Sequence, residues 1–327
     1  MSLELLKLNE NLYLVTGQNA GRFPCAHSFL VQDRLCALID SGCGFEILKE
    51  IRESFSVDLV INSHGHPDHS SGNWLFPDVP LYAPKEGTES HGRLLPLSHR
   101  FFGPGPLADH WRGWIRQVMG FVDHPATNFF SDGHIFDFGH LKLKAIHAPG
   151  HTSDHYCFFE PENRILLSFD IDFTSFGPWY GNLESNLSEF KRSIDIIRGL
   201  DPKLVASSHL HPIGEGIEQA LQDYTSVIDK RRRKIIELVS HGISRSALVD
   251  AAPVYRRHLH GPELFRFFEG RMIDLHLEEL LAQGIIDRQG EEYRLASSEP
   301  ASSLEPLRRA VWGMDSSSCS GRYGNSY

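Results

Sequence analysis

The segment INSHGHPDHSSGN, residues 61–73, constrains this 327-residue chain more than any other feature. Three histidines and one aspartate, His64, His66, Asp68 and His69, directly follow an apolar run that predicts a buried strand. Polar side chains crowded at the end of a strand lie where a loop leaves a sheet. Because imidazole and carboxylate groups are good ligands for zinc, iron or manganese, the segment predicts a metal site at a sheet edge.

The spacing within this segment predicts two neighbouring ion positions. His64 and His66 are two residues apart, so on an extended segment both side chains point the same way and can hold one ion. Pro67 forces the chain to bend. After that bend, Asp68 and His69 can face a second ion nearby.

Further ligands must come from other strand ends, and the sequence offers three. HAPGHTSDH places His151 after a strand and a Pro-Gly turn, LLSFDIDF places Asp170 at the end of an apolar run, and ASSHLHP places His209 after another strand. Two alternatives stay open at this point. Asp172 would share the facing of Asp170 on a strand, and His211 competes with His209 for the last position.

Taken together and in this order, these motifs resemble the metallo-beta-lactamase superfamily. The HxHxDH pattern of that family appears as HGHPDH, residues 64–69, and APGHTSDH, SFD and SSH follow in the family's order and approximate spacing. Upstream, LIDSGCG resembles its Asp-x-Gly turn through Asp40 and Gly42. The resemblance covers roughly residues 5–213.

The resemblance implies an α+β fold, the αββα metallo-beta-lactamase sandwich, with a dinuclear site along one edge. Two divalent metal ions are the implied cofactors, with zinc expected and iron or manganese as alternatives. The implied ligands are His64, His66 and His151 for the first ion, Asp68, His69 and His209 for the second, and Asp170 as the bridge. Two departures exist: Phe169 replaces the usual glycine before the bridging aspartate, and Ser207-Ser208 replace a common Pro-Gly.

The chain beyond the motifs predicts two additions to the sandwich. Within the metallo-beta-lactamase domain, residues 1–213, we expect a helical insertion at about 77–132 that either packs into the core or covers a substrate site. Residues 214–296 predict three helices and a hairpin turning at Gln289-Gly290, an outline that resembles a winged helix. Residues 297–327 are expected to be a disordered tail, since the chain ends on the small, polar stretch SSSCSGRYGNSY.

The implied ligand set predicts hydrolysis by metal-activated water. Two ions about 3.5–4 Å apart can hold a hydroxide between them, and zinc lowers the pKa of bound water to about 7. Asp68 would orient this nucleophile or take its proton. The leading hypothesis is a metal-dependent hydrolase that uses a metal-bridging hydroxide to cleave a small ester or thioester. His66 stands where redox members of the superfamily have glutamate, which favours hydrolysis.

Two other functions remain open. One is an endoribonuclease or phosphodiesterase acting on single-stranded nucleic acid, and the other is a ligand-sensing regulator whose winged helix binds DNA. The basic run DKRRRK, residues 229–234, is typical of a solvated helix face or of phosphate contact. The net charge of -10 gives no global attraction to phosphate backbones, so it counts against the regulator and mildly against the nuclease.

Compartment and partners follow from simpler features. Five cysteines without a CxxC pair argue against a disulfide framework. The chain lacks a run of about 18 apolar residues, so we expect no membrane span. Its start, MSLELLKLNENLYLV, lacks a basic region and a cleavage site, which favours a cytoplasmic protein. Winged helices also form dimer contacts, so a homodimer is a further expectation.

Overall fold

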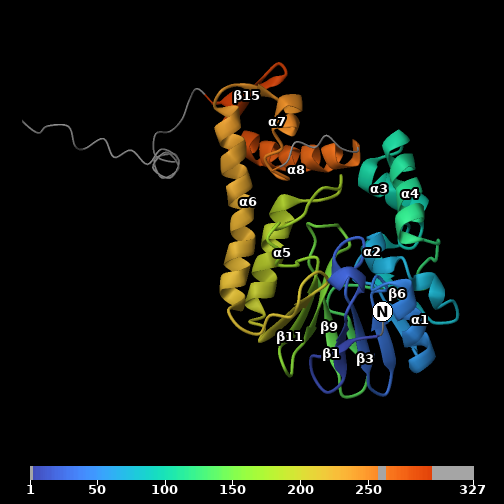
Figure 1. The fold of residues 1–327 in the computed structure, drawn as a ribbon. Coiled ribbons are helices and arrows are strands. Elements are labelled where there is room, and N and C mark those ends of the chain that lie inside the picture. Colours follow the sequence, from blue (N-terminus) through green and yellow to red (C-terminus); the bar gives the residue numbers. More distant parts are fainter. Residues whose placement is uncertain (1–2, 257–262, 297–327) are drawn as a thin grey trace, which may run out of the picture.

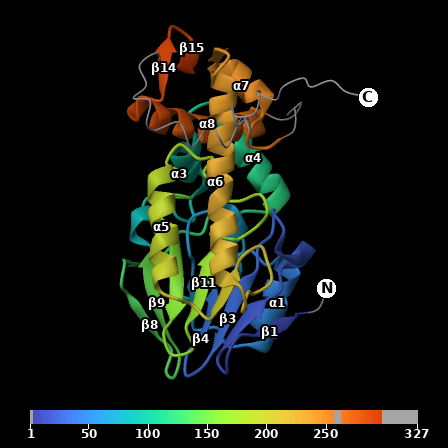
Figure 2. The same ribbon diagram turned by 90° about the vertical axis from the view of Figure 1, so that its left-hand side faces the viewer.

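Two β-sheets packed face to face, with helices on their outer faces, form the body of the molecule (Figures 1 and 2). The computed structural model describes residues 3–256 and 263–296. Helices α5 and α6 cover one sheet, and α1 covers the other. The predicted αββα layering is therefore confirmed.

The first sheet has seven strands that follow one another in sequence order. They are β1 (Leu5–Lys7), β2 (Leu12–Val15), β3 (Ser28–Gln32), β4 (Cys36–Ile39), β5 (Leu59–Ile61), β6 (Leu81–Pro84) and β7 (Asn128–Phe130). Strands β1 to β4 pair antiparallel, whereas β4 to β7 pair parallel. Parallel neighbours need a crossover, and α1 (Phe45–Ser54) supplies the one between β4 and β5.

The second sheet has five strands in the order β12-β11-β10-β9-β8. They are β8 (Ile135–Asp137), β9 (Lys142–His147), β10 (Tyr156–Glu160), β11 (Ile165–Phe169) and β12 (Leu204–Ser207). Only β11 and β12 pair parallel, and the crossover between them is α5 (Leu187–Gly199). That helix begins where the Asn186 side chain accepts a hydrogen bond from the Glu189 N–H, a regular N-cap.

The interior between the sheets is built from alternating apolar side chains. In β9, Leu143 and Ala145 are buried and Lys142 and Lys144 are exposed, which is the period of two expected of a half-buried strand. Phe169, the residue that departs from the family's usual glycine, is fully buried here. Its ring meets Phe29 and Phe158 edge-on at 5.6 and 5.4 Å, so this departure fills the core.

The expected insertion is helical only in its middle part. Helices α3 (Leu94–Phe102) and α4 (Pro106–Met119) form a hairpin, and α4 starts with proline and ends at Gly120 in the left-handed region, φ 59°. The two ends of the range 77–132 are instead strands β6 and β7 of the first sheet. The helical insertion into the sandwich therefore spans about 94–119 rather than the whole predicted range.

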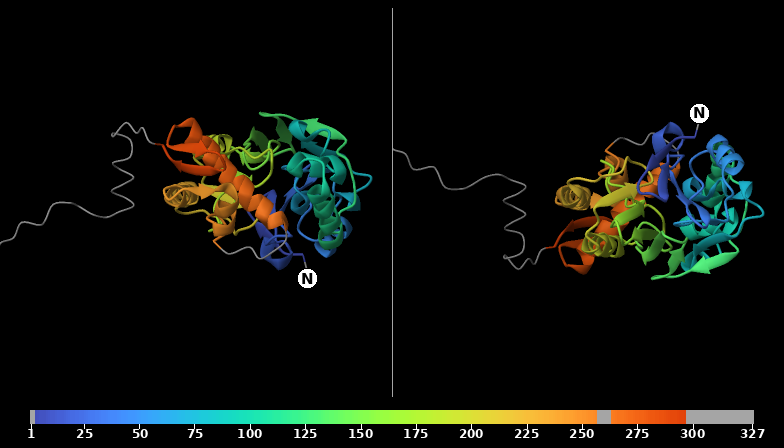
Figure 3. Two further views of the ribbon diagram at one scale, coloured as in Figure 1. Left: turned by 90° about the horizontal axis from the view of Figure 1, so that it is seen from above. Right: turned by 90° about the horizontal axis from the view of Figure 1, so that it is seen from below.

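The region after residue 213 covers part of one outer face of the sandwich with α6 and lies over one end of it with the remaining elements. Its elements are α6 (Ile217–Val239), β13 (Ile243–Ser244), α7 (Arg245–Ala251), α8 (Glu263–Ala282), β14 (Ile286–Gln289) and β15 (Glu292–Leu295). The three strands pair in the order β13-β15-β14, and the predicted hairpin forms with its turn at Gly290-Glu291, one residue later than the predicted Gln289-Gly290. Helix α6 runs beside α5, and α8 crosses the top of the molecule toward α3 and α4 (Figure 3).

Side chains of α5, α6 and α8 share one buried cluster, so this region is continuous with the sandwich core. The expected boundary at residue 213 stays a prediction, and the expected tail at 297–327 lies outside the described residues. In the two described ranges, each helix falls short of the length or the apolar character that crossing a bilayer requires.

Candidate metal centre

The seven side chains predicted as metal ligands all follow the carboxyl ends of strands. His64 to His69 follow β5, His151 follows β9, Asp170 follows β11, and His209 follows β12. Within the first segment, Pro67, Asp68 and His69 lie in the short helix α2 (Pro67–Ser70). Proline suits the first position of a helix, and α2 begins at Pro67. The bend expected at this proline is therefore the start of a helix.

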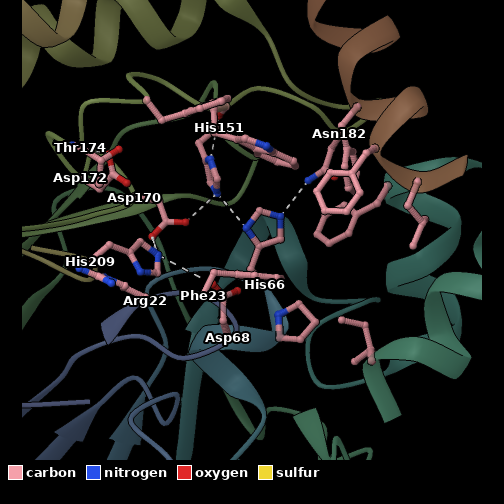
Figure 4. A pocket seen from close by; sticks show the side chains of 18 of the residues that line it. Arg22, Phe23, His66, Asp68, His151, Asp170, Asp172, Thr174, Asn182 and His209 are labelled. Atoms are coloured by element: carbon pink, nitrogen blue, oxygen red, sulfur yellow. Dashed lines mark hydrogen bonds and ion pairs between the residues drawn. The ribbon is translucent and has the colours of Figure 1, made fainter. Parts of the chain in front are cut away.

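The structure brings these seven side chains together in two adjoining clusters. Figure 4 labels those that also face the neighbouring cavity, His66, Asp68, His151, Asp170 and His209. One potential ligand atom from each residue lies within 4.8 Å of those of the other members of its cluster. The first cluster consists of His64, His66, His151 and Asp170, and the second consists of Asp68, His69 and His209. All but His209 are buried, and the His209 side chain is 14% exposed.

Asp170 lies between the two clusters. Its Oδ1 is 2.9 Å from His69 Nε2 and 3.4 Å from His209 Nε2. Its Oδ2 is 3.1 Å from His151 Nε2 and 3.7 Å from His64 Nε2. A carboxylate whose two oxygens face different clusters has the arrangement that a bridge between two cations requires.

Four of the histidines present Nε2 to a cluster while their Nδ1 is held from outside. The four contacts are His64 with Ser63 Oγ at 2.9 Å, His69 with Asp40 Oδ2 at 2.7 Å, His151 with the Trp179 carbonyl at 2.9 Å, and His209 with the Gly21 carbonyl at 2.7 Å. Each outer partner can accept a hydrogen bond from Nδ1–H. These contacts fix the ring orientation and leave the Nε2 lone pair directed at the cluster.

His66 has the opposite orientation. Its Nδ1 lies 3.0 Å from His64 Nε2 and 2.8 Å from His151 Nε2, and its Nε2 lies 2.9 Å from the Asn182 side-chain amide. An imidazole that binds a cation through Nδ1 carries its proton on Nε2 and donates it. In the structure the Asn182 amide nitrogen, Nδ2, faces this ring nitrogen, so the amide has to turn over and present its oxygen in order to hold His66 in the orientation that metal binding needs.

Replacing Asn182 by leucine is therefore expected to weaken zinc binding by about 10- to 100-fold, because His66 loses the acceptor that fixes its ring. Asn182→Asp keeps an acceptor of the same shape and is expected to retain most of the affinity. Competition with a chromogenic chelator measures both affinities. A leucine variant that binds zinc as tightly as the unmodified protein would show that Asn182 only packs.

Burial and charge act in opposite directions on the histidines. Burial lowers the pKa of His64 well below its usual value. For His69 and His209 burial also lowers the pKa, but the nearby carboxylates, Asp170 foremost, outweigh it. They raise the pKa of His69 well above its usual value and that of His209 to about 9. When no cation is bound, protons on His69 and His209 therefore balance part of the negative charge of the carboxylates.

The donor set fits divalent cations. His69 Nε2 and Asp170 Oδ1 are buried and lie 2.9 Å apart, which places an imidazole nitrogen and a carboxylate oxygen close enough to share one cation. Both atoms face the inside of the clusters. Imidazole nitrogen and carboxylate oxygen suit zinc, iron and manganese alike, so the arrangement supports metal binding and leaves the metal's identity as a prediction.

The two alternatives left open by the sequence lie outside the clusters. The Asp172 carboxylate accepts hydrogen bonds from the Thr174 N–H at 3.1 Å and the Thr174 hydroxyl at 3.2 Å. The His211 ring packs against His27, with centroids 6.4 Å apart. Neither belongs to a potential metal-binding group of the described residues.

The Asp-x-Gly turn after β4 supports the second cluster. Besides contacting His69, Asp40 accepts hydrogen bonds from the Ser63 N–H and hydroxyl, each at 2.8 Å. Gly42 is required by close approach, because a Cβ atom there would lie 1.4 Å from the Asp68 carbonyl oxygen. The sequence motif thus corresponds to a turn that packs directly against the segment that carries the ligands.

A largely buried group of three charged residues, which the sequence did not indicate, links the loops of the site to the inserted helices. Arg100 of α3 pairs with Asp154 at 2.6 Å and with Glu184 at 2.8 Å. Burial alone would raise the pKa of Asp154, but the Arg100 guanidinium holds it well below its usual range. The three residues connect the inserted helices to the loops that carry His151 and Asn182.

A cavity of about 610 Å³ opens beside the two clusters. The cluster side chains form its floor, and mostly apolar side chains from three separate regions form its walls (Figure 4). These include Trp111 and Trp114 of α4, Phe176 and Trp179 of the loop after β11, and Phe265 and Phe268 of α8. Helix α4 thus covers a cavity next to the site, while its Ala108 packs in a buried cluster with Leu94 and Leu97 of α3, so both interpretations of the insertion apply.

Comparisons with known proteins also indicate a metal-binding member of the metallo-beta-lactamase superfamily. The sequence model of the metallo-beta-lactamase superfamily matches residues 21–209. The chain is 25% identical to acyl-coenzyme A thioesterase MBLAC2 of Bos taurus over 201 residues, which are 54% of this chain and 70% of that protein. It is 26% identical to atrochrysone carboxyl ACP thioesterase dmxR1 of a Cryptosporiopsis species over 175 residues, 50% of this chain and 44% of that protein.

Among solved structures, the metallo-beta-lactamase family protein TTHA1429 of Thermus thermophilus superposes with a TM-score of 0.68 at 20% identity. The superposition covers 88% of this chain and 100% of that one, so the two share a fold over most of their length. The family match, the two clusters and the mixed sheets agree with one another. The chain belongs to the metallo-beta-lactamase superfamily and is a metal-dependent hydrolase.

Proposed function

We propose that this protein hydrolyses thioesters of apolar acyl groups at a dinuclear metal site. The observation that carries the proposal is the cavity of about 610 Å³, which joins a largely apolar chamber to the clusters at its floor. Pockets of this size suit small-molecule ligands, and an apolar wall favours an apolar acyl chain over a charged one. Relatives named as thioesterases support the choice of a thioester over other substrates.

The proposed ligands are those that the sequence predicted. They are His64, His66 and His151 for the first ion, Asp68, His69 and His209 for the second, and Asp170 between them. When bound, two divalent cations supply Lewis acidity and make a water molecule nucleophilic near neutral pH. Zinc stays the expected metal, with iron or manganese as alternatives.

The protein's own groups would complete the site. Asp68 Oδ2 lies 3.9 Å from His69 Nε2 and 3.8 Å from His209 Nε2, so one of its oxygens faces the second cluster. A carboxylate has a second oxygen, with which Asp68 can orient the attacking group or accept its proton. Trp179 and Phe268 pack against each other with ring centroids 5.2 Å apart and would exclude water from the acyl side.

We also propose that residues 214–296 form a winged-helix-like domain. The order α6, β13, α7, α8 and the hairpin β14–β15, with its three-stranded sheet, supports this assignment. Leu264, Phe265 and Phe268 at the start of α8 line the cavity. These side chains face the proposed substrate, which counts against a regulator that uses this helix to read DNA. The cytoplasmic location and the homodimer stay predictions.

A substrate panel tests the proposed function. We expect S-acyl N-acetylcysteamine thioesters to be cleaved faster than a lactone, an aryl phosphodiester or labelled single-stranded RNA. His66→Ala is expected to abolish the cleavage, and His211→Ala, outside both clusters, serves as the matched control. Cleavage of RNA that disappears in the His66 variant would support the nuclease hypothesis instead.

Replacing Phe268 by alanine is expected to lower the preference for an octanoyl over an acetyl thioester about tenfold. The change removes an aromatic wall from the cavity, and burial of a large apolar side chain is worth about 1.5–3 kcal/mol. The ratio of the two kcat/KM values measures the effect. Phe129→Ala on β7, where the side chain is 39% exposed, makes the same change away from the cavity and should leave the ratio unaltered. An unchanged ratio in the Phe268 variant would place the acyl group elsewhere.

A further inference from the structure

A second pocket, of about 380 Å³, lies between α6 and the segment that follows α7. Four of its lining residues are cationic, Lys230, Arg231, Lys234 and Arg256, and the segment 251–253 supplies a floor of two alanines and one proline. Four positively charged side chains thus line one pocket, although the whole chain has a net charge of -10. Such a concentration of one sign attracts anions locally.

The four cations of this pocket differ in how much of their charge is free to attract an anion. Among the described residues, Lys230 and Arg256 are exposed and form no ion pair, and Lys234 pairs with Glu237 at 3.0 Å on the surface. Arg231 is buried, and its guanidinium donates to backbone carbonyl oxygens, such as that of Phe176 at 2.6 Å, rather than to a carboxylate. Carbonyl oxygens do not neutralise a positive charge.

The segment that carries Arg256 is held in a strained conformation. Ala252 and Arg256 both lie in the left-handed region, with φ of 45° and 57°, which side chains other than glycine rarely adopt. The buried carboxylate of Glu269 accepts hydrogen bonds from the N–H groups of Val254 and Tyr255, each at 2.9 Å. Strain of this kind persists only where the surroundings fix it, and it concentrates at ligand-binding loops.

A single aromatic layer separates this pocket from the cavity beside the metal clusters. Phe176 and Tyr255 line that cavity, and their ring centroids are 5.2 Å apart. On the other side of the layer, the Arg231 guanidinium lies 4.6 Å from the Phe176 ring centroid. Arg256 directly follows Tyr255 in the chain. The two pockets are therefore neighbours, and a substrate with one end in each would have to pass its arm around the edge of this aromatic layer.

We infer that this second pocket binds the phosphates of coenzyme A, the thiol carrier of the thioester, an inference that rests on the proposed function. Coenzyme A carries three phosphates, so it matches a group of several cations better than the single phosphodiester of a carrier protein does. The apolar side chains of the segment 251–253 offer the adenine base a surface to pack against. The pantetheine arm leads from the phosphates to the thioester at the metal clusters.

The basic run DKRRRK acquires two roles in this arrangement. Lys230 and Lys234 are four residues apart, so they lie on one face of α6 and both line the pocket. Arg233, between them in sequence, is exposed and does not line it. One face of the run contacts phosphate and another is solvated, so each of the two interpretations of this motif applies to part of it. Arg233 also provides a control of equal charge on the same helix.

Isothermal titration with adenosine 3′,5′-bisphosphate, the nucleotide part of coenzyme A, tests the pocket without catalysis. We expect the unmodified protein and Arg233→Gln to bind it with equal affinity. Lys230→Gln combined with Arg256→Gln is expected to bind it at least tenfold more weakly. Both changes are on exposed side chains, and circular dichroism checks that the fold is retained. Binding that is absent in all proteins, or unaltered in the double variant, overturns the inference.

Kinetics separate this inference from the proposed function. The ratio of kcat/KM for an octanoyl-coenzyme A thioester to that for the N-acetylcysteamine thioester is expected to fall about tenfold in the double variant and to stay constant in Arg233→Gln. If both thioesters are hydrolysed and the ratio of the two kcat/KM values is the same in the unmodified protein and in both variants, the phosphate site is wrong. The proposed thioesterase function is then still supported. Bisphosphate binding without hydrolysis of any thioester overturns the proposed function. Single-stranded RNA that binds through these cations in preference to the bisphosphate also overturns the inference.

Discussion

Replacing Asp170 by asparagine is expected to lower kcat/KM for thioester hydrolysis on the order of 10³-fold. The carboxylate faces the first cluster with one oxygen and the second with the other, at distances of 2.9 Å to His69 and 3.1 Å to His151. Asparagine has nearly the same shape but no charge, and its amide nitrogen cannot act as a ligand. The variant should therefore lose much of its affinity for at least one ion.

Metal analysis and kinetics on the same preparation check this expectation. We expect about two ions per chain in the unmodified protein and fewer in Asp170→Asn, with activity falling in parallel. Asp172→Asn is the matched control, because this carboxylate is two residues away and lies outside both clusters. Its activity is expected to change less than tenfold. A larger loss in the Asp172 variant than in the Asp170 variant would exchange the roles assigned to the two residues.

The sequence predicted the arrangement of the clusters because each ligand motif stands directly after an apolar strand. Carboxyl ends of neighbouring parallel strands meet at one edge of a sheet, as β4 and β5 do in one sheet and β11 and β12 do in the other. Residues such as Asp170 and His209 are therefore brought together by topology alone. The layers of the fold were predicted through the resemblance of these motifs to the metallo-beta-lactamase superfamily, because the alternation of strands and helices does not by itself fix how two sheets pack.

The supports of the clusters could not be predicted in this way. Two of the outer acceptors are the backbone carbonyls of Gly21 and Trp179, which any residue could supply. Asn182 and the Arg100 ion cluster lie in loops and an inserted helix whose position depends on tertiary packing. A signal existed only for Asp40, because it stands in a recognisable turn motif after a strand.

The cavity was hidden from the sequence for a different reason. Apolar residues of α4 and α8, among them Trp114 and Phe268, have the helical spacing that core residues also have. Only the position of these helices above the clusters turns part of their apolar faces into cavity walls. The exposed Phe23, which stacks on Trp114 with ring centroids 5.8 Å apart, extends this surface.

Removal of the metal ions with a chelator is expected to reduce thioester hydrolysis on the order of 10³-fold or more, and added zinc should restore it. It should also lower the melting temperature, because ions bound a thousandfold above their dissociation constant stabilise a protein by about 4 kcal/mol. Calorimetry of the loaded and the metal-free protein measures the difference. Equal activity and equal melting temperature would show that the clusters need no ion.

The loss of stability should depend on pH. In the metal-free protein, the carboxylates of Asp170 and Asp68 outweigh burial and raise the pKa of His209 from 6.5 to about 9. A raised pKa contributes stability that is fully present below 6.5 and is lost as the pH rises through about 9. Bound cations compensate the same carboxylates without a proton. The gap in melting temperature between the loaded and the metal-free protein is therefore expected to widen from pH 6.5 to pH 9, and a gap that narrows over this range would contradict the proton's role.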